Sequence, residues 1–199
     1  MSSSNHPIVF VTSNPNKLRD ARKILGSDRL LETRNADLVE IQGEPVEIAR
    51  HKCIEALRLH RDTEPNNWAA TIVIEDTALC MNALGGLPGP FIKWFQRRLT
   101  PADLHRMLSG FSDYRAQFVS TVAVGSWTSD GSAQIRVFQS VVNGEIVQPR
   151  GLMGDRGGWD PCFRPLGSPK TFGEMEESER STYCARLAAL TLLRTALFN

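Results

Sequence analysis

The sequence predicts a mixed α/β fold, built either on one long curved sheet or on two lobes that meet at a cleft. In the first half, continuous apolar runs that suit strands buried on both faces alternate with helical patterns. In the second half, strand patterns joined by a turn signal follow one another. A chain of 199 residues, of which 41% are hydrophobic, can form one large domain or two small lobes.

Strand and helix patterns alternate over the first half of the chain. Asn14 and Pro15 form a helix start, because Asn caps the first amides and Pro suits the first helical position, and Gly26 ends this helix. In chain order we predict a strand at 8–11, a helix from Pro15, a helix from Pro45, a strand at 71–74 that ends at Glu75 and Asp76, and a helix capped by Thr100 and Pro101.

The second half is predicted to contain an antiparallel lobe, then a loop and a helix. Asn143-Gly144 is a strong two-residue hairpin signal, since both residues tolerate positive φ. In chain order we predict strands at 118–124 and 135–142, the turn at 143–144, a strand at 146–147, a Gly- and Pro-rich loop at 149–171 and a helix from about Ser178. The antiparallel lobe covers roughly 116–148 of a single domain, 1–199.

Composition excludes several classes of protein. The net charge of +1, from 23 Lys and Arg against 22 Asp and Glu, is too balanced for a general nucleic-acid binder. The four cysteines lack zinc spacing and indicate reduced thiols in a cytosolic protein. The polar start carries no secretory signal, and no apolar run reaches the ~20 residues that span a bilayer. We therefore expect a cytoplasmic protein that binds neither nucleic acid nor membrane.

A first candidate site lies between the strand at 8–11 and its helix. Backbone N–H groups and the helix dipole favour an anion at such a place. Lys17 adds a positive charge, and Thr12 and Asn14 add neutral polar contacts. The segment lacks the glycine frame of a P-loop, and the alternative interpretation is an ordinary strand–helix turn with a capping Asn.

Two adjacent carboxylates, Glu75 and Asp76, form a second candidate at the end of an apolar strand. Neighbouring side chains of an extended chain point to opposite faces, so only one of the two can easily face a given metal. Carboxylate oxygens and waters are the usual ligands of Mg²⁺ near phosphates, and Glu40 or Glu44 could supply a second carboxylate. The alternative is that the two acids, with Thr77, cap the next segment.

Two glycine-bearing blocks complete the candidates. In 85–95, glycine turns fix the backbone before a helix with Lys93 near its start. The alternative is a rigid connector whose aromatic residues belong to the core. In 157–163, glycine allows a ligand to approach the backbone, Trp159 offers a flat surface and Asp160 an acceptor. The alternative is that Trp159 packs in the hydrophobic core.

The order and spacing of these motifs resemble the inosine triphosphate pyrophosphatase family over nearly the whole chain. The block Gly-Gly-Leu-Pro-Gly-Pro-Phe-Ile-Lys-Trp-Phe at 85–95 is especially specific and is similar to the eukaryotic branch. The other matching segments are Thr12-Ser13-Asn14-x-x-Lys17, Glu40, 42–45, Lys52-Cys53, 75–77 and 158–163. The resemblance implies a homodimer in which a long, mixed, twisted sheet and its helices form two lobes around a central substrate cleft.

The resemblance also implies an enzyme, a hydrolase of acid anhydrides in nucleotide metabolism. Family members convert inosine, deoxyinosine and xanthosine triphosphates to the monophosphate and pyrophosphate, which cleanses the nucleotide pool. By motif match, Glu40 and Asp76 would bind Mg²⁺, with Mn²⁺ as a substitute, and Asp76 would be the catalytic base, assisted by Glu75 and Lys17. The residues that would hold the nucleotide are Thr12, Asn14, Lys17, Lys52, Asp76, Thr77, Lys93, Gly157, Gly158, Trp159, Asp160, Arg180 and Arg186.

Two stretches of the base pocket depart from the family pattern, which has Phe-Gly-Trp-Asp in one and Ser-His-Arg after a Lys in the other. The matching residues here are Gly157-Gly158-Trp159-Asp160, Cys184-Ala185-Arg186 and, for the Lys, Arg180. The stacking Phe and the base-contacting His are thus absent, whereas the metal and phosphate residues are all present. We expect retained chemistry with altered base selectivity. The alternatives are a catalytically inactive nucleotide-binding protein and a house-cleaning pyrophosphatase for other modified nucleotides.

Overall fold

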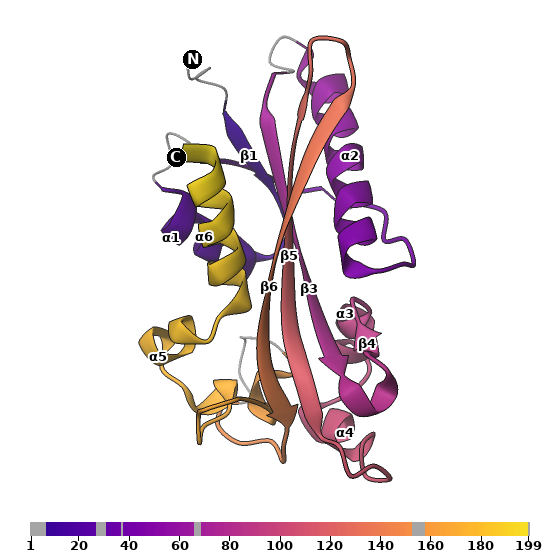
Figure 1. The fold of residues 1–199 in the computed structure, drawn as a ribbon, viewed down its shortest axis with the longest axis vertical. Helices are drawn as coiled ribbons and strands as arrows, with labels where there is room; N and C mark the ends of the chain where they lie inside the picture. The colour runs from indigo at the N-terminus through magenta and orange to yellow at the C-terminus, as the bar shows by residue number, and fades with distance from the viewer. Residues whose placement is uncertain (1–6, 27–30, 37, 66–68, 153–157, 199) are drawn as a thin grey trace. The chain divides into compact units, whose positions relative to one another are not determined.

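A computed structural model of the chain describes residues 7–26, 31–36, 38–65, 69–152 and 158–198 (Figure 1). Within these residues, seven strands form one mixed sheet accompanied by helices, which confirms the predicted α/β class. The chain divides into two compact units. Unit 1 holds the residues up to Asp76, Thr121–Gln139 and those from Arg186 onward, and unit 2 holds Thr77–Ser120 and Ser140–Ala185. These boundaries differ from the predicted lobe at 116–148, because the two strands of that lobe contribute to both units.

The sheet combines a parallel and an antiparallel part. In pairing order its strands are β2 (Leu31–Arg34), β1 (Ile8–Val11), β3 (Thr71–Met81), β5 (Arg115–Trp127), β6 (Ala133–Ile146) and β7 (Phe163–Pro165), while β4 (Pro88–Gly89) pairs with β3. Strand β1 runs parallel to both β2 and β3. The pairs β3–β4 and β6–β7 are antiparallel.

The helices of the described residues begin where the sequence predicts, except for the last one. They are α1 (Pro15–Leu25), α2 (Pro45–Thr63), α3 (Ile92–Gln96), α4 (Pro101–Arg106), α5 (Glu177–Thr182) and α6 (Ala185–Phe198). Proline occupies the first turn of α1, α2 and α4. Thr100 caps α4, since its hydroxyl oxygen accepts the N–H of Asp103 at 3.2 Å. These starts are local features of the chain, which is why the sequence predicts them.

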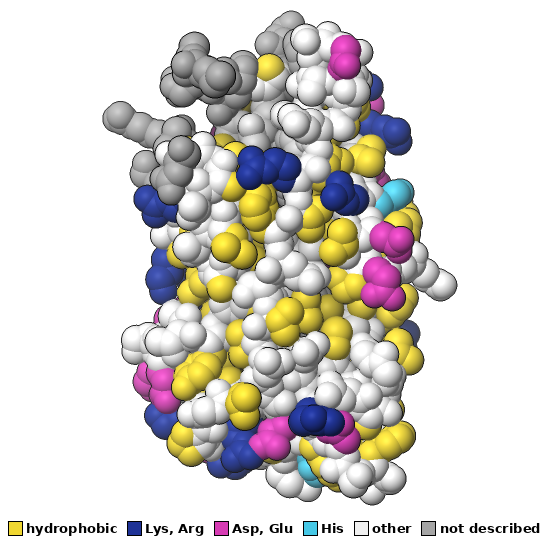
Figure 2. Space-filling model, viewed as in Figure 1, with side chains coloured by type: hydrophobic (Ala, Val, Ile, Leu, Met, Phe, Trp, Pro, Cys, Tyr) yellow, Lys and Arg dark blue, Asp and Glu magenta, His cyan; other side chains and the backbone are white. Residues whose placement is uncertain are grey.

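Charged side chains of both signs are interspersed on the face of the protein seen in Figure 2. In the described ranges, no helix is long and apolar enough to cross a membrane.

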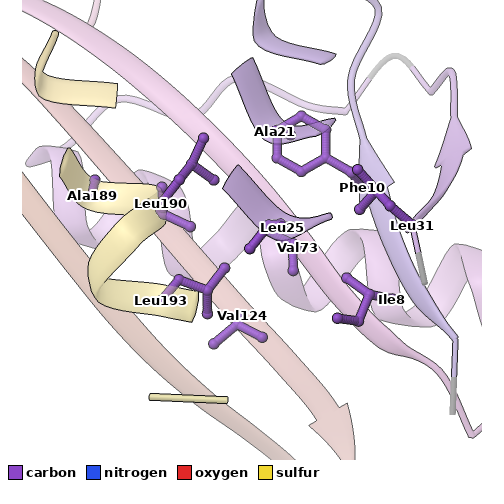
Figure 3. Packing of buried hydrophobic residues seen from close by; sticks show 11 residues of the cluster. Ile8, Phe10, Ala21, Leu25, Leu31, Val73, Val124, Ala189, Leu190 and Leu193 are labelled. Carbon is purple, nitrogen blue, oxygen red and sulfur yellow. The ribbon is translucent and has the colours of Figure 1, made fainter. Parts of the chain in front are cut away.

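Unit 1 buries two apolar clusters, one formed with α1 and α6 and the other with α2. Figure 1 shows these helices on opposite sides of the strands. The first cluster includes Ile8, Phe10, Ala21, Leu25, Val73, Leu190 and Leu193 (Figure 3). The second includes Val9, Val11, Ala49, Cys53, Leu57, Ile72 and Ile74. Successive residues of β1 and β3 therefore alternate between the clusters, as the period of a strand requires, and this explains their continuous apolar sequences.

The predicted hairpin turn at Asn143-Gly144 is wrong, because β6 continues through both residues. Gly144 instead pairs with Pro165 of β7. A side chain at this position would meet the backbone carbonyl of Arg164, and its Cβ would lie 2.6 Å from Cζ of Phe163. Glycine is therefore needed here for the close approach of two strands, a use that the Asn-Gly pair does not reveal in sequence.

The predicted final helix is interrupted. It starts within one residue of Ser178, as expected, but it ends after a short α5, and α6 follows as a separate helix. The hydroxyls of Ser181 and Thr182 donate to the carbonyls of Glu177 and Glu179 at 2.8 and 2.7 Å. Hydroxyl groups that bond to helical carbonyls compete with the helix, and two in succession favour a break at this point.

The four cysteines are free thiols, as the sequence predicts. Burial raises the pKa of both Cys53 and Cys162 from 9.0 to about 12. Such a rise lowers the reactive thiolate fraction at pH 8 by a factor on the order of a thousand. We expect both thiols to resist brief iodoacetamide treatment at pH 8 and to react once guanidinium unfolds the protein, as peptide mass spectrometry would measure. Rapid labelling of either thiol in the native protein would contradict its buried position.

Candidate functional site

The turn after β1 is built as a helix cap. Oδ1 of Asn14 accepts the N–H of Asn16 at 2.9 Å and that of Lys17 at 3.4 Å. Oγ1 of Thr12 accepts the N–H of Asn14 at 3.1 Å. The interpretation of Asn14 as a cap is thus confirmed. A phosphate at this helix start would have to displace Asn14 from these amides, so the side chain of Lys17 is the main source of positive charge here.

The sequence predicts that the strand ends at Glu75 and Asp76, and this prediction is wrong. Strand β3 continues to Met81, because apolar side chains beyond the two acids are also buried. Its register with β1, however, ends at Val73. The two carboxylates therefore lie just past the carboxyl end of β1, at the edge of the parallel part of the sheet. Ligands commonly bind at this edge of α/β sheets.

Glu75 and Asp76 have different cationic partners on different helices. Oε2 of Glu75 lies 3.0 Å from Nζ of Lys17, which comes from α1, and 3.3 Å from Nε of Arg186, which comes from α6. Oδ1 of Asp76 lies 3.2 Å from Nζ of Lys52, on α2. These are the helices of the two apolar clusters, so the two acids point to opposite faces, as expected for neighbours in a strand.

The ammonium of Lys52 is shared by two carboxylates. Its Nζ donates to Oδ1 of Asp76 at 3.2 Å and lies 3.6 Å from Oε1 of Glu40. The three side chains are 11%, 15% and 30% exposed for Lys52, Asp76 and Glu40, so the group remains open to solvent. The structure therefore brings together both predicted metal ligands and one predicted phosphate ligand. Glu44, the alternative to Glu40, is instead used in the capping box of α2.

The donor set fits the predicted Mg²⁺. The carboxylates of Glu40 and Asp76 both approach the ammonium of Lys52. Mg²⁺ is usually held by one or two carboxylates together with waters and substrate phosphates. Within the described part of the chain, no group of three or more His, Cys, Asp or Glu side chains is placed to hold a metal. Two carboxylates that retain access to solvent suit an ion that also binds waters and substrate phosphates.

Sequence reasoning missed Asp20, which completes a buried ionic group. Its Oδ2 accepts a hydrogen bond from Arg186 at 2.7 Å. The side chains of Asp20 and Glu75 are 6% and 0% exposed. Lys17 also donates to the backbone carbonyl of Glu75 at 2.8 Å, so two cations face two buried carboxylates. Arg186, predicted to contact substrate, pairs with Asp20 and Glu75 in this structure.

The sequence does contain a weak signal for Asp20. It follows Lys17 by three residues, so both lie on one face of α1, next to Ala21 of the apolar stripe. A carboxylate among core-facing positions requires a cation nearby. The identity of that cation could not be predicted, because Arg186 is 166 residues away in the chain.

In unit 2, Trp159 is buried in an aromatic cluster. It is 6% exposed, and its ring centroid lies 5.2 Å from that of Phe118, 5.5 Å from that of Phe163 and 6.0 Å from that of Phe172. Edge-to-face contacts, such as those with Phe118 and Phe163, stabilise cores. The structure therefore favours the interpretation that Trp159 packs in the core over the interpretation that it offers an open stacking surface.

The neighbouring Asp160 is also buried, and its Oδ2 accepts a hydrogen bond from Arg180 at 2.7 Å. The guanidinium of Arg180 lies 5.2 Å from the ring of Phe172. At Gly158, a Cβ would lie 3.2 Å from Cγ of Gln96, so this glycine allows close contact with the protein itself. These residues thus form a preorganised group, in which Oδ2 of Asp160 already accepts a hydrogen bond from Arg180.

Lys93, Thr77 and Gly157 complete the predicted residues. Lys93 is exposed on α3, with Nζ 6.0 Å from the ring of Trp94, which is 49% exposed. The alternative that assigned Trp94 to the core is therefore wrong. Thr77 is half-buried on β3, and Ala185, in the position of the family's His, is fully buried at the start of α6. Gly157 lies outside the described residues.

Known proteins resemble this chain along nearly its whole length. A family model described as the Ham1 family matches residues 8–196. The Ham1 protein of Staphylococcus aureus is 22% identical with a TM-score of 0.73, over 96% of this chain and 97% of its own. A HAM1 protein from Coxiella burnetii is 24% identical with a TM-score of 0.77, over 96% and 98%. A nucleoside-triphosphatase, or dITP/XTP pyrophosphatase, from Mycobacterium abscessus is 25% identical with a TM-score of 0.68, over 94% and 98%.

Proposed function

Because the chain belongs to the Ham1 family, we propose that it is a nucleoside triphosphate pyrophosphatase that acts on inosine, deoxyinosine and xanthosine triphosphates. The observation that carries this proposal is the placement of Lys52 between Glu40 and Asp76, the residue that follows the Lys17-bound Glu75 in the chain. The dITP/XTP pyrophosphatase activity named for the Mycobacterium abscessus structure supports the substrate class. As the resemblance implies, we also propose a homodimeric, cytoplasmic enzyme.

The products follow from attack of water on the α-phosphorus. A bond forms between phosphorus and the water oxygen, and the bond to the oxygen that bridges the α and β phosphates breaks, which releases pyrophosphate. The water must lose a proton, and negative charge develops on the leaving pyrophosphate. Asp76 would take the proton at a carboxylate oxygen, since it is the solvent-accessible acid of the Glu75-Asp76 pair.

Two lysines would offset the charge of the phosphates. Lys52 is held by Asp76 and Glu40, and Lys17 is held by the carbonyl and carboxylate of Glu75. Fixed positive groups stabilise developing charge more than mobile ones, because they need no reorganisation during the reaction. Glu75 would therefore assist catalysis by orienting Lys17 and not by contacting the water.

Glu40 and Asp76 would hold Mg²⁺, with Mn²⁺ as a substitute, and the ion would supply charge neutralisation at the phosphates. We further propose that Thr12, Asn14, Thr77 and Lys93 make the other contacts to the phosphates and sugar. For Thr12 and Asn14 this requires an exchange of the local hydrogen bonds that they make in the cap.

Base recognition is assigned to the group around Asp160 and Arg180, with Trp159 as its support. Arg180 already donates a hydrogen bond to Asp160, which leaves fewer of their polar atoms for a base. The family's stacking Phe and base-contacting His have no counterpart in the matching segments. Loss of one aromatic stack costs ~1–3 kcal/mol. We therefore propose that discrimination between oxo- and amino-purines is weaker than the intact motif would give.

A substrate panel tests both parts of the proposal. We expect Mg²⁺-dependent release of pyrophosphate from inosine, deoxyinosine and xanthosine triphosphates, with a kcat/KM no more than about 100-fold above those for ATP and GTP. A larger preference for inosine would contradict altered selectivity. Thermal stabilisation by nucleotides without turnover would favour the inactive binding protein, and fastest turnover of modified pyrimidine triphosphates would favour the other house-cleaning activity.

A further inference from the structure

Glu40 lies in a segment without regular structure, between β2 and α2. Leu38 packs against the apolar cluster of α2, whereas the side chain of Val39 is 59% exposed. Burial of Val39 therefore contributes little to the ordering of the backbone next to Glu40. Fixing an irregular segment is entropically unfavourable, so other interactions must hold it.

One such interaction comes from Glu55 on α2. Its Oε2 accepts the backbone N–H of Val39 at 2.9 Å. Hydrogen bonds with an ionised acceptor are stronger than those between neutral groups. Glu55 is half-buried, although the hydrogen bond itself lies at an exposed position.

The position of Glu55 on α2 links this bond to the candidate site. It follows Lys52 by three residues, so the two side chains lie on one face of the helix. Glu55 holds the backbone of Val39, and Lys52 lies 3.6 Å from the carboxylate of the next residue, Glu40. Adjacent residues of the segment are thus tied to one face of one helix, by a backbone contact and a side-chain contact.

We propose that Glu55 is a positioning residue for Glu40, which acts by anchoring the N–H of Val39. This role rests on the proposed function, because it is the placement of Glu40 toward metal and phosphates that Glu55 would preserve. Without the anchor, the placement of Glu40 would depend more on its contact with Lys52, whose ammonium also binds Asp76. Loss of Glu55 should therefore weaken the use of Mg²⁺ before it affects the chemical step.

The test compares Glu55→Ala with Glu55→Gln in the full-length protein. For Glu55→Ala we expect amide hydrogen exchange in the 38–44 peptide, without metal or nucleotide, to be about 5- to 10-fold faster. The Mg²⁺ concentration for half-maximal pyrophosphate release should rise about 5- to 10-fold, with kcat at saturating Mg²⁺ within about twofold. Glu55→Gln should lie close to wild type in both measurements, since its amide oxygen can still accept the N–H of Val39.

Asp62→Ala is the matched control, because it removes an exposed carboxylate from the same helix, and it should leave both measurements unchanged. Wild-type exchange and Mg²⁺ dependence in Glu55→Ala would overturn the proposal. So would a Gln variant as impaired as the Ala variant, because the charge and not the hydrogen bond would then be responsible. If the wild type itself releases no pyrophosphate, the proposed function fails, and the exchange rates alone decide whether Glu55 anchors the segment.

Discussion

Replacing Asp76 with Asn is expected to lower kcat for pyrophosphate release by about 10²- to 10⁴-fold. The amide side chain of this variant has nearly the shape of the carboxylate but can neither accept the proton of water nor contribute negative charge to a metal site. Nζ of Lys52, now 3.2 Å from Oδ1 of Asp76, would keep Glu40 as its charged partner. Because the side chain is 15% exposed and its neighbours in β3 are unchanged, the fold should be retained.

The measurement is steady-state pyrophosphate release from inosine triphosphate with Mg²⁺, together with a thermal melt that reports folding. Asp113→Asn is the matched control. It makes the same substitution in an aspartate that pairs with Arg115 in unit 2, outside the candidate site. We expect the control to keep turnover within about twofold of wild type. Near-native turnover of Asp76→Asn would remove Asp76 from both the base and the metal roles.

The parts of the fold that the sequence predicts are those fixed by neighbouring residues. The start of α1 at Asn14 and Pro15 depends on a cap and a proline that lie side by side in the chain. The opposite orientation of Glu75 and Asp76 follows from strand geometry alone. The short strands β2, β4 and β7 were not predicted, because so few residues carry little periodic signal.

The features that the sequence does not reveal depend on contacts between distant residues. Asn143-Gly144 has the composition of a turn, but Phe163 and Arg164 approach it closely and keep the strand extended. Trp159 occurs among glycines and prolines, a composition typical of a ligand-binding loop, yet its ring contacts three phenylalanines. In each case the local pattern fits two structures, and tertiary packing selects between them.

The site divides its charges between exposed and buried roles. The carboxylates of Glu40 and Asp76 are 30% and 15% exposed, whereas those of Glu75 and Asp20 are 0% and 6% exposed and face Lys17 and Arg186. A buried ionic group is weak support for stability as a whole, but the loss of one member is costly because its partners remain charged and desolvated. We therefore expect the enclosed group to control folding more strongly than the accessible one.

Arg186→Met is the most direct test of that expectation. The variant keeps a long side chain but leaves Asp20 and Glu75, 6% and 0% exposed, without the guanidinium that now lies 2.7 and 3.3 Å from them. Removing one partner of a buried pair costs about 3–5 kcal/mol in the free energy of unfolding. We expect about 3 kcal/mol, near the lower limit, because Lys17 still faces Glu75. Urea denaturation followed by circular dichroism measures the difference.

Arg194→Met provides the control on the same helix. Arg194 is exposed and donates to the backbone carbonyl of Ile24 at 3.0 Å, so its loss should cost no more than about 1 kcal/mol. Adding Asp20→Asn to Arg186→Met should recover part of the stability, since one of the two uncompensated carboxylates is then neutral. If Arg186→Met is no less stable than Arg194→Met but loses turnover, Arg186 serves the nucleotide and not the fold, because a substrate contact alone leaves the free energy of unfolding unchanged.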